Sequence, residues 1–220
     1  MTRVLALAGT LTVALAFGGA AAAKPPLPAV LVDTESSAED IVDYALAGDR
    51  GQVVSTAARL KASADGPAAS ALVRSGVPAA TVAQLALRAN RVARVAHGAP
   101  FVTVALAANA VSGLMPVLYD RFANRVPAAI LRLDYLDREA ELHSLARQPA
   151  KVSPAVQQLA ATWTHVRAKV IAAGGAAEAR AFGRHVAAMR RLDPDAGKPV
   201  QAEAARGLEL VDRLEDVFLR

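Results

Sequence analysis

Apolar residues recur at steps of three and four along most of the chain, which is the spacing of one face of an α-helix. The clearest stripe runs through Val82, Leu85, Ala89, Val92 and Ala96. Similar stripes follow in the ranges 127–147, 154–173, 176–192 and 200–220. No segment sustains the two-residue alternation of a β-strand. The pattern therefore predicts an all-α fold.

Prolines and glycines separate these stripes into about seven to nine helices, which we expect to form a multi-helix bundle. Ser36-Ser37-Ala38-Glu39 has the form of a capping box, with Ser36 as the N-cap of the first helix. The proline-rich residues before it, 24–35, are predicted to be extended. Ser153-Pro154 similarly predicts the start of a later helix.

The N-terminus has the three parts of a secretory signal peptide. Arg3 provides the positive charge, an apolar run follows, and Ala21-Ala22-Ala23 fits the small-residue cleavage rule. We expect residues 1–23 to be a signal peptide cleaved between Ala20 and Lys24, 24–35 an extended segment and 36–220 a single helical domain. The protein would then be periplasmic or secreted. The alternative is an uncleaved membrane anchor, which the glycine- and alanine-rich end of the run disfavours.

Gly98 to Tyr119 contains no charged residue and is long enough to cross a membrane. Alanine dominates it, however, and Asn109, Ser112, Gly113 and Pro116 weaken it as a membrane span. A helix packed on all sides has the same composition. We therefore expect Pro100 to Tyr119 to be a central core helix, with Pro116 kinking or ending it.

Composition excludes several classes of site. The 220 residues include no cysteine, so thiolate zinc sites, cysteine nucleophiles and covalently attached haem are ruled out. The net charge of +5 is mild and aromatic residues make up 4% of the chain, which does not indicate nucleic-acid binding.

Two groups of residues could bind metal. Asp134, Asp137 and Glu141 form an acidic stripe at helical spacing, and Glu139 and His143 are four residues apart. A di-metal carboxylate site uses Glu-x-x-His, which does not occur, so the stripe is interpreted as a solvated face.

His185 and Met189 lie four residues apart beside an apolar stripe, and with Met115 they are the candidates for copper or haem ligation. Neighbours on one helix cannot bind opposite sides of a haem. The competing interpretation places Met189 in the core and His185 at its edge.

No catalytic motif was found. Arg88, Arg91 and Arg94 line one flank of a helix, where contact with a membrane or an acidic partner is an alternative to a solvated face. The sequence favours an exported, soluble, non-enzymatic protein of the cell envelope that binds another protein or a small molecule. The alternative is a periplasmic bundle that handles metal or haem.

Overall fold

The computed structural model describes residues 23–220, so the predicted signal peptide lies outside the described residues except for Ala23. Ten helical segments, and no named strand, occur within this range. They are α1 (Ala29–Leu46), α2 (Arg50–Asp65), α3 (Pro67–Arg74), α4 (Ala79–Ala96), α5 (Phe101–Ser112), α6 (Met115–Tyr119), α7 (Ala128–Leu145), α8 (Pro149–Ala172), α9 (Ala176–Met189) and α10 (Lys198–Leu219). The predicted all-α multi-helix bundle is confirmed.

Proline marks most of the helix starts, because its fixed φ suits the first turn and its missing N–H has no helical partner there. Proline is the residue just before the helix or among its first two in α1, α3, α4, α5, α6, α7, α8 and α10. Helix α2 starts differently, since the Asp49 carboxylate accepts a hydrogen bond from the backbone N–H of Gln52 at 3.0 Å.

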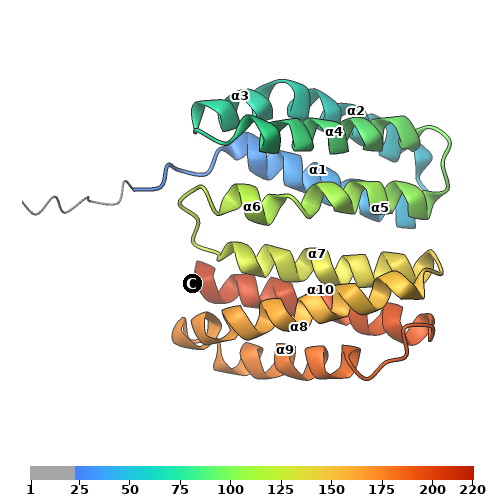
Figure 1. Ribbon diagram of the computed structural model, residues 1–220, viewed down its shortest axis with the longest axis vertical. Helices are drawn as coiled ribbons and strands as arrows, with labels where there is room; N and C mark the ends of the chain where they lie inside the picture. Colours follow the sequence, from blue (N-terminus) through green and yellow to red (C-terminus); the bar gives the residue numbers. More distant parts are fainter. Residues whose placement is uncertain (1–22) are drawn as a thin grey trace, which may run out of the picture.

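The helices form two halves stacked along the long axis of the molecule (Figure 1). The N-terminal half comprises α1 to α6 and the C-terminal half α7 to α10, and each has its own cluster of buried apolar side chains. Leu142 of α7 belongs to the first cluster, although most of the buried residues of α7 belong to the second.

Helix α7 joins the halves, because it packs against α8 and α10 on one side and against α5 and α6 on the other. The approach of α5 to α7 is close at Gly113. A Cβ atom added to Gly113 would lie 2.6 Å from the ring of Tyr135, so a larger residue there would clash with that side chain.

The predicted extended segment 24–35 is wrong for its second part, because α1 begins at Ala29 rather than at Ser36. Leu31 and Thr34 are fully buried against the N-terminal core, and this packing extends the helix upstream. Ser37, from the predicted cap, instead donates from Oγ to the carbonyl of Asp33 inside the helix at 2.7 Å. Pro28 takes the N-cap position without a side-chain cap.

The predicted helix start at Ser153-Pro154 is also wrong, because α8 begins at Pro149 and runs through Pro154. Val152, one turn into the helix, is buried and anchors this early part to the C-terminal core. Pro154 is exposed. The helix therefore loses one backbone hydrogen bond near its start, at a position that faces solvent.

The apolar segment predicted as one central helix is divided into α5 and α6 at Gly113 and Leu114, and Pro116 lies in the first turn of α6. Phe101–Tyr119 is the one stretch among the described residues that is long and apolar enough to cross a membrane, judged by length and composition. In the fold, 61% of its apolar window is buried inside the protein. This agrees with a core position.

Matched substitutions in this segment distinguish a core from a membrane span. Val104 is completely buried, whereas Val117 is 52% exposed. We expect Val104→Asp to lower the free energy of unfolding by about 3 kcal/mol or more, because an unpaired charge is buried. Val117→Asp should change it by about 0.5 kcal/mol or less. Denaturant unfolding of the detergent-free protein measures both, and a need for detergent or equal damage from both changes would contradict the core assignment.

Candidate functional site

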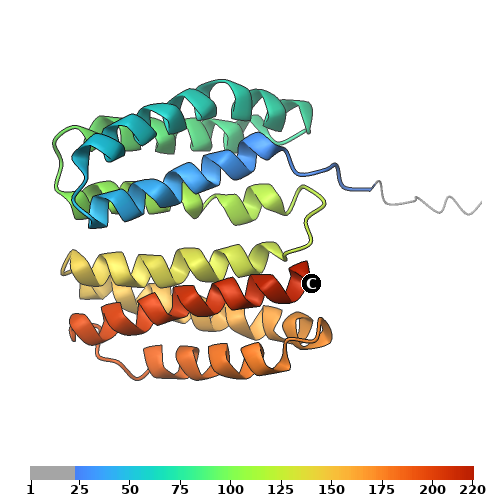
Figure 2. The same cartoon turned by 180° about the vertical axis from the view of Figure 1, so that it is seen from behind.

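An acidic pocket of about 130 Å³ lies where the two halves meet. Figure 2 shows α1 and α10, which supply four of its acidic residues, on the near face of the molecule, one in each half. Helices α5 and α7 complete the lining. The pocket is lined by Glu35 and Glu39 of α1, Ser112 of α5, Leu131, Asp134 and Arg138 of α7, and Asp212 and Glu215 of α10.

Four of its carboxylates lack a cationic partner. Within residues 23–220, no basic side chain forms an ion pair with Glu35, Glu39, Asp212 or Glu215. Glu35 accepts a short hydrogen bond from the hydroxyl of Tyr119, which holds one of its oxygens in place. Negative charge therefore gathers on both sides of the pocket.

Ser112 adds an unsatisfied polar group to the same pocket. The residue is 5% exposed, and its Oγ is buried without a hydrogen-bond partner in the described structure. A helical serine ordinarily donates to the carbonyl four residues earlier. A buried hydroxyl without that bond costs free energy until something in the pocket pairs with it.

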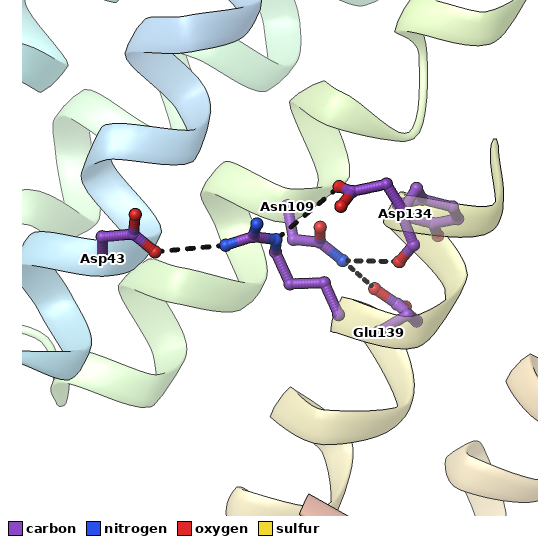
Figure 3. Close-up of polar contacts among 6 residues, drawn as sticks. Asp43, Asn109, Asp134 and Glu139 are labelled. Atoms are coloured by element: carbon purple, nitrogen blue, oxygen red, sulfur yellow. Dashed lines mark hydrogen bonds and ion pairs between the residues drawn. The ribbon is translucent and has the colours of Figure 1, made fainter. Parts of the chain in front are cut away.

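Arg138 partly balances the negative charge. Its guanidinium lies 3.2 Å from the carboxylate of Asp43 of α1 and 3.8 Å from that of Asp134, and both carboxylates appear in Figure 3. The Arg138 side chain is 12% exposed. This arginine therefore connects the two halves. Its ion pairs are with Asp43 and Asp134, and its charge also acts on the nearby carboxylate of Glu39, opposing the rise in the pKa of that group.

Three glutamates of the pocket, Glu35, Glu39 and Glu215, hold protons unusually strongly. Burial raises the pKa of Glu35 to about 8, against the lowering effect of the Tyr119 hydrogen bond. Burial, with the nearby charge of Asp134, raises the pKa of Glu39 and that of Glu215 to about 7. Burial also raises the pKa of Asp134. The acidic pocket thus exchanges protons near neutral pH.

The prediction of a solvated acidic face on α7 is wrong for two of its three members. Asp137 is completely buried, and the Asp134 side chain is 18% exposed. Glu141 is intermediate in exposure. The error has a simple cause: α7 is covered from both sides, so its polar stripe faces other helices instead of water.

Glu139 and His143 form the predicted pair, with His143 Nε2 3.0 Å from a Glu139 oxygen. The amide of Asn109 of α5 donates to the other Glu139 oxygen at 2.8 Å, so this pair also spans the halves (Figure 3). His143 Nδ1 lies 3.0 Å from the side-chain oxygen of Gln148. These contacts satisfy both ring nitrogens of a buried histidine.

His185 lies at the centre of a second polar cluster, in the core of the C-terminal half. Its Nε2 is 2.9 Å from Asp137 and its Nδ1 is 3.0 Å from Glu203. Burial lowers the pKa of His185, but hydrogen bonds and charges from the two carboxylates outweigh burial and raise it. Burial raises the pKa of Asp137 to about 6. The histidine is thus fully buried rather than at the core edge.

The structure does not bring the three candidate metal ligands together. His185 and Met189 are buried in the C-terminal half, whereas Met115 is buried in the core of the N-terminal half. Both nitrogens of His185 already contact carboxylates. Among residues 23–220, no group of three or more His, Cys, Asp or Glu side chains is arranged to hold a metal ion.

The arginine flank of α4 lies beside a shallow hollow that Tyr135 also lines. Arg91 and Arg94 are exposed, as a solvated face requires. Arg88 is only intermediate in exposure, because its guanidinium donates a short hydrogen bond to the carbonyl of Ala110 of α5. One member of the flank therefore has a packing role.

A pair of glycine substitutions tests the buried histidine cluster. A Cβ at Gly207 would lie 2.4 Å from an Asp137 oxygen and 2.6 Å from His185 Nε2, whereas a Cβ at Gly183 would meet its nearest neighbour at an ordinary 3.6 Å. We expect Gly207→Ala to lower the free energy of unfolding by about 2–4 kcal/mol. Gly183→Ala should raise it by about 0.5–1 kcal/mol. Urea unfolding measures both, and a stabilised Gly207→Ala variant would contradict the cluster.

The raised pKa values predict an unusual pH dependence of stability. From about pH 4.5 to pH 8 the folded chain holds protons on Glu35, Glu39 and Glu215 that the unfolded chain releases, so the free energy of unfolding falls as pH rises. Each such proton contributes about 1.4 kcal/mol per pH unit. The raised pKa values of His185 and Asp137 act in the same direction.

We therefore expect the melting temperature to fall between pH 5 and pH 8.5. The double variant Glu35→Gln/Glu215→Gln should show a shallower fall, because its pocket has fewer protons to lose. Calorimetric melting across this range gives both slopes. A melting temperature that is constant or rises with pH would contradict the burial of these carboxylates.

Comparison with models of known protein families, with curated proteins and with solved structures found no match to this chain. Function is therefore inferred from the residues of the chain itself. Of the two polar clusters, the one around His185 is enclosed in the core, while the acidic pocket reaches the surface through the exposed Asp212. The acidic pocket is the candidate functional site.

Proposed function

We propose that the mature chain is an exported, non-enzymatic binding protein of the cell envelope, and that its acidic pocket holds a small cationic ligand. Export rests on the signal-peptide pattern of residues 1–23. The binding role rests on one observation. Four carboxylates that form no ion pair with a basic side chain among residues 23–220 surround a space that also contains the unsatisfied hydroxyl of Ser112.

A bound cation would relieve an electrostatic imbalance in the pocket. The carboxylates of α1 and α10 repel one another across the junction, and burial removes the water that would otherwise screen them. Without a ligand, protons reduce this repulsion. A cation would reduce this repulsion more fully, and it would donate a hydrogen bond to Ser112 Oγ from an N–H group or through a bound water.

The experiment is thermal unfolding of the mature chain at low ionic strength, with and without millimolar calcium chloride, butylamine or 1,4-diaminobutane. A ligand that binds the folded state raises the melting temperature, and the rise grows with the logarithm of the ligand concentration above its dissociation constant. We expect at least one of these cations to raise the melting temperature at pH 8.

Export is tested separately by sequencing the N-terminus of the chain recovered from the cell envelope. Its first residue should lie at or just before Lys24, and a retained Met1 would contradict export.

Charge-matched variants separate the pocket from general attraction. Glu39→Gln/Glu215→Gln removes two pocket carboxylates, whereas Asp40→Asn/Glu209→Gln removes two exposed ones from the same helices. The ligand-induced rise should be lost in the first pair and kept in the second. The proposed function would be overturned if no cation raises the melting temperature, or if both double variants lose the ligand-induced rise equally.

A further inference from the structure

The unpaired carboxylates of the acidic pocket form two pairs on different helices. Glu35 and Glu39 are four residues apart on α1, so they stand about 6 Å apart along the helix axis. Asp212 and Glu215 are three residues apart on α10, about 4.5 Å along that axis. Negative charge is therefore spread along the pocket instead of being concentrated at one point.

This spread does not suit a bare metal ion. Calcium takes six to eight oxygen ligands at about 2.3–2.6 Å, all converging on one centre. The described residues contain no cluster of three or more potential metal-binding side chains arranged in that way. A ligand that satisfies both carboxylate pairs must carry its positive charge in two places.

The remaining lining suits a short aliphatic chain between two charges. Leu131 offers an apolar contact for methylene groups, and Ser112 Oγ is a free acceptor for an ammonium N–H. The cavity volume of about 130 Å³ limits the ligand to a small molecule.

We propose that the ligand of the acidic pocket is a short linear diamine in its doubly protonated form, with one ammonium group near Glu35 and Glu39 and the other near Asp212 and Glu215. This inference rests on the proposed function and specifies its ligand. Extended 1,4-diaminobutane separates its two nitrogens by about 6 Å from standard bond lengths, which sets the distance between the two carboxylate pairs that the ligand can bridge.

Arg138 forms its ion pairs with Asp43 and Asp134 rather than with the four carboxylates assigned to the ligand, although its charge also acts on Glu39. Tyr119 of α6 donates to one oxygen of Glu35 and leaves the other available to the ligand. The charged groups that face the pocket are thus the carboxylates of α1, α7 and α10 and the guanidinium of Arg138, while α5 contributes the neutral Ser112. A dication would displace the protons that Glu35 and Glu39 hold near neutral pH.

Isothermal titration calorimetry of the mature chain at low ionic strength tests the inference. The titrants are linear diamines with two to eight carbons, butylamine and calcium chloride. We expect the dissociation constant to pass through a minimum at three to five carbons, and the four-carbon diamine to bind about tenfold more tightly than butylamine. Binding at pH 7 should release protons, seen as a heat that depends on the ionisation enthalpy of the buffer.

Variants assign the two ends of the ligand. Glu39→Gln and Glu215→Gln should each weaken the binding of 1,4-diaminobutane strongly and that of butylamine less. The control variant Asp40→Asn/Glu209→Gln should leave the affinity for both amines unchanged. Ser112→Ala should weaken diamine binding several-fold without unfolding the chain, since it removes a hydroxyl that has no partner in the fold. Melting curves of each variant confirm that it is folded.

The outcomes separate the two proposals. If calcium binds most tightly, or if butylamine equals every diamine, the diamine inference is wrong and the cation-binding pocket stands. If the affinity rises steadily with the length of the diamine, the pocket does not select for the distance between the two ammonium groups, and the inference is also wrong. If no cation binds, the proposed function falls together with its ligand.

Discussion

Helix α7 packs against both halves of the molecule, so its polar side chains must find partners on several neighbouring helices instead of in water. Three clusters meet this requirement. Arg138 reaches Asp43 of α1, Glu139 accepts from Asn109 of α5, and Asp137 contacts His185 of α9. Removing one member of a buried pair leaves its partner unpaired, which is far more costly than the pair is stabilising. The stacking of the two halves therefore depends on this helix.

The acidic pocket arises from the same arrangement. Where α1 and α10 approach the polar face of α7, acidic residues from three helices outnumber the single arginine. The excess charge raises the pKa values of Glu35, Glu39 and Glu215, in addition to the effect of burial. An interface built for structure alone would pair these carboxylates or replace them, because unpaired buried charge lowers stability. The cationic ligand that we propose would give the imbalance a role.

The His185 cluster shows how the same residue types serve packing. Its two carboxylates hold both nitrogens of the imidazole, and the absence of a side chain at Gly207 allows α10 to lie against it. Phe182 meets the ring edge-on, with centroids 5.2 Å apart. The imidazole is completely buried, so this cluster orients α7, α9 and α10 relative to one another.

Local information in the sequence determined the helices of this protein: apolar periodicity, proline at helix starts and glycine at breaks predict an all-α fold, and the absence of charge near Pro100–Tyr119 predicts a segment that is largely buried. Local signals were misleading where tertiary packing was stronger, as at Ser36, which lies inside α1 because Leu31 and Thr34 are buried upstream. The acidic pocket could not be predicted, because Glu35 and Glu215 lie near opposite ends of the chain and no spacing relates them. Whether a carboxylate on α7 meets water or another helix was decided by the tertiary structure alone, since burial depends on which distant segments cover that face.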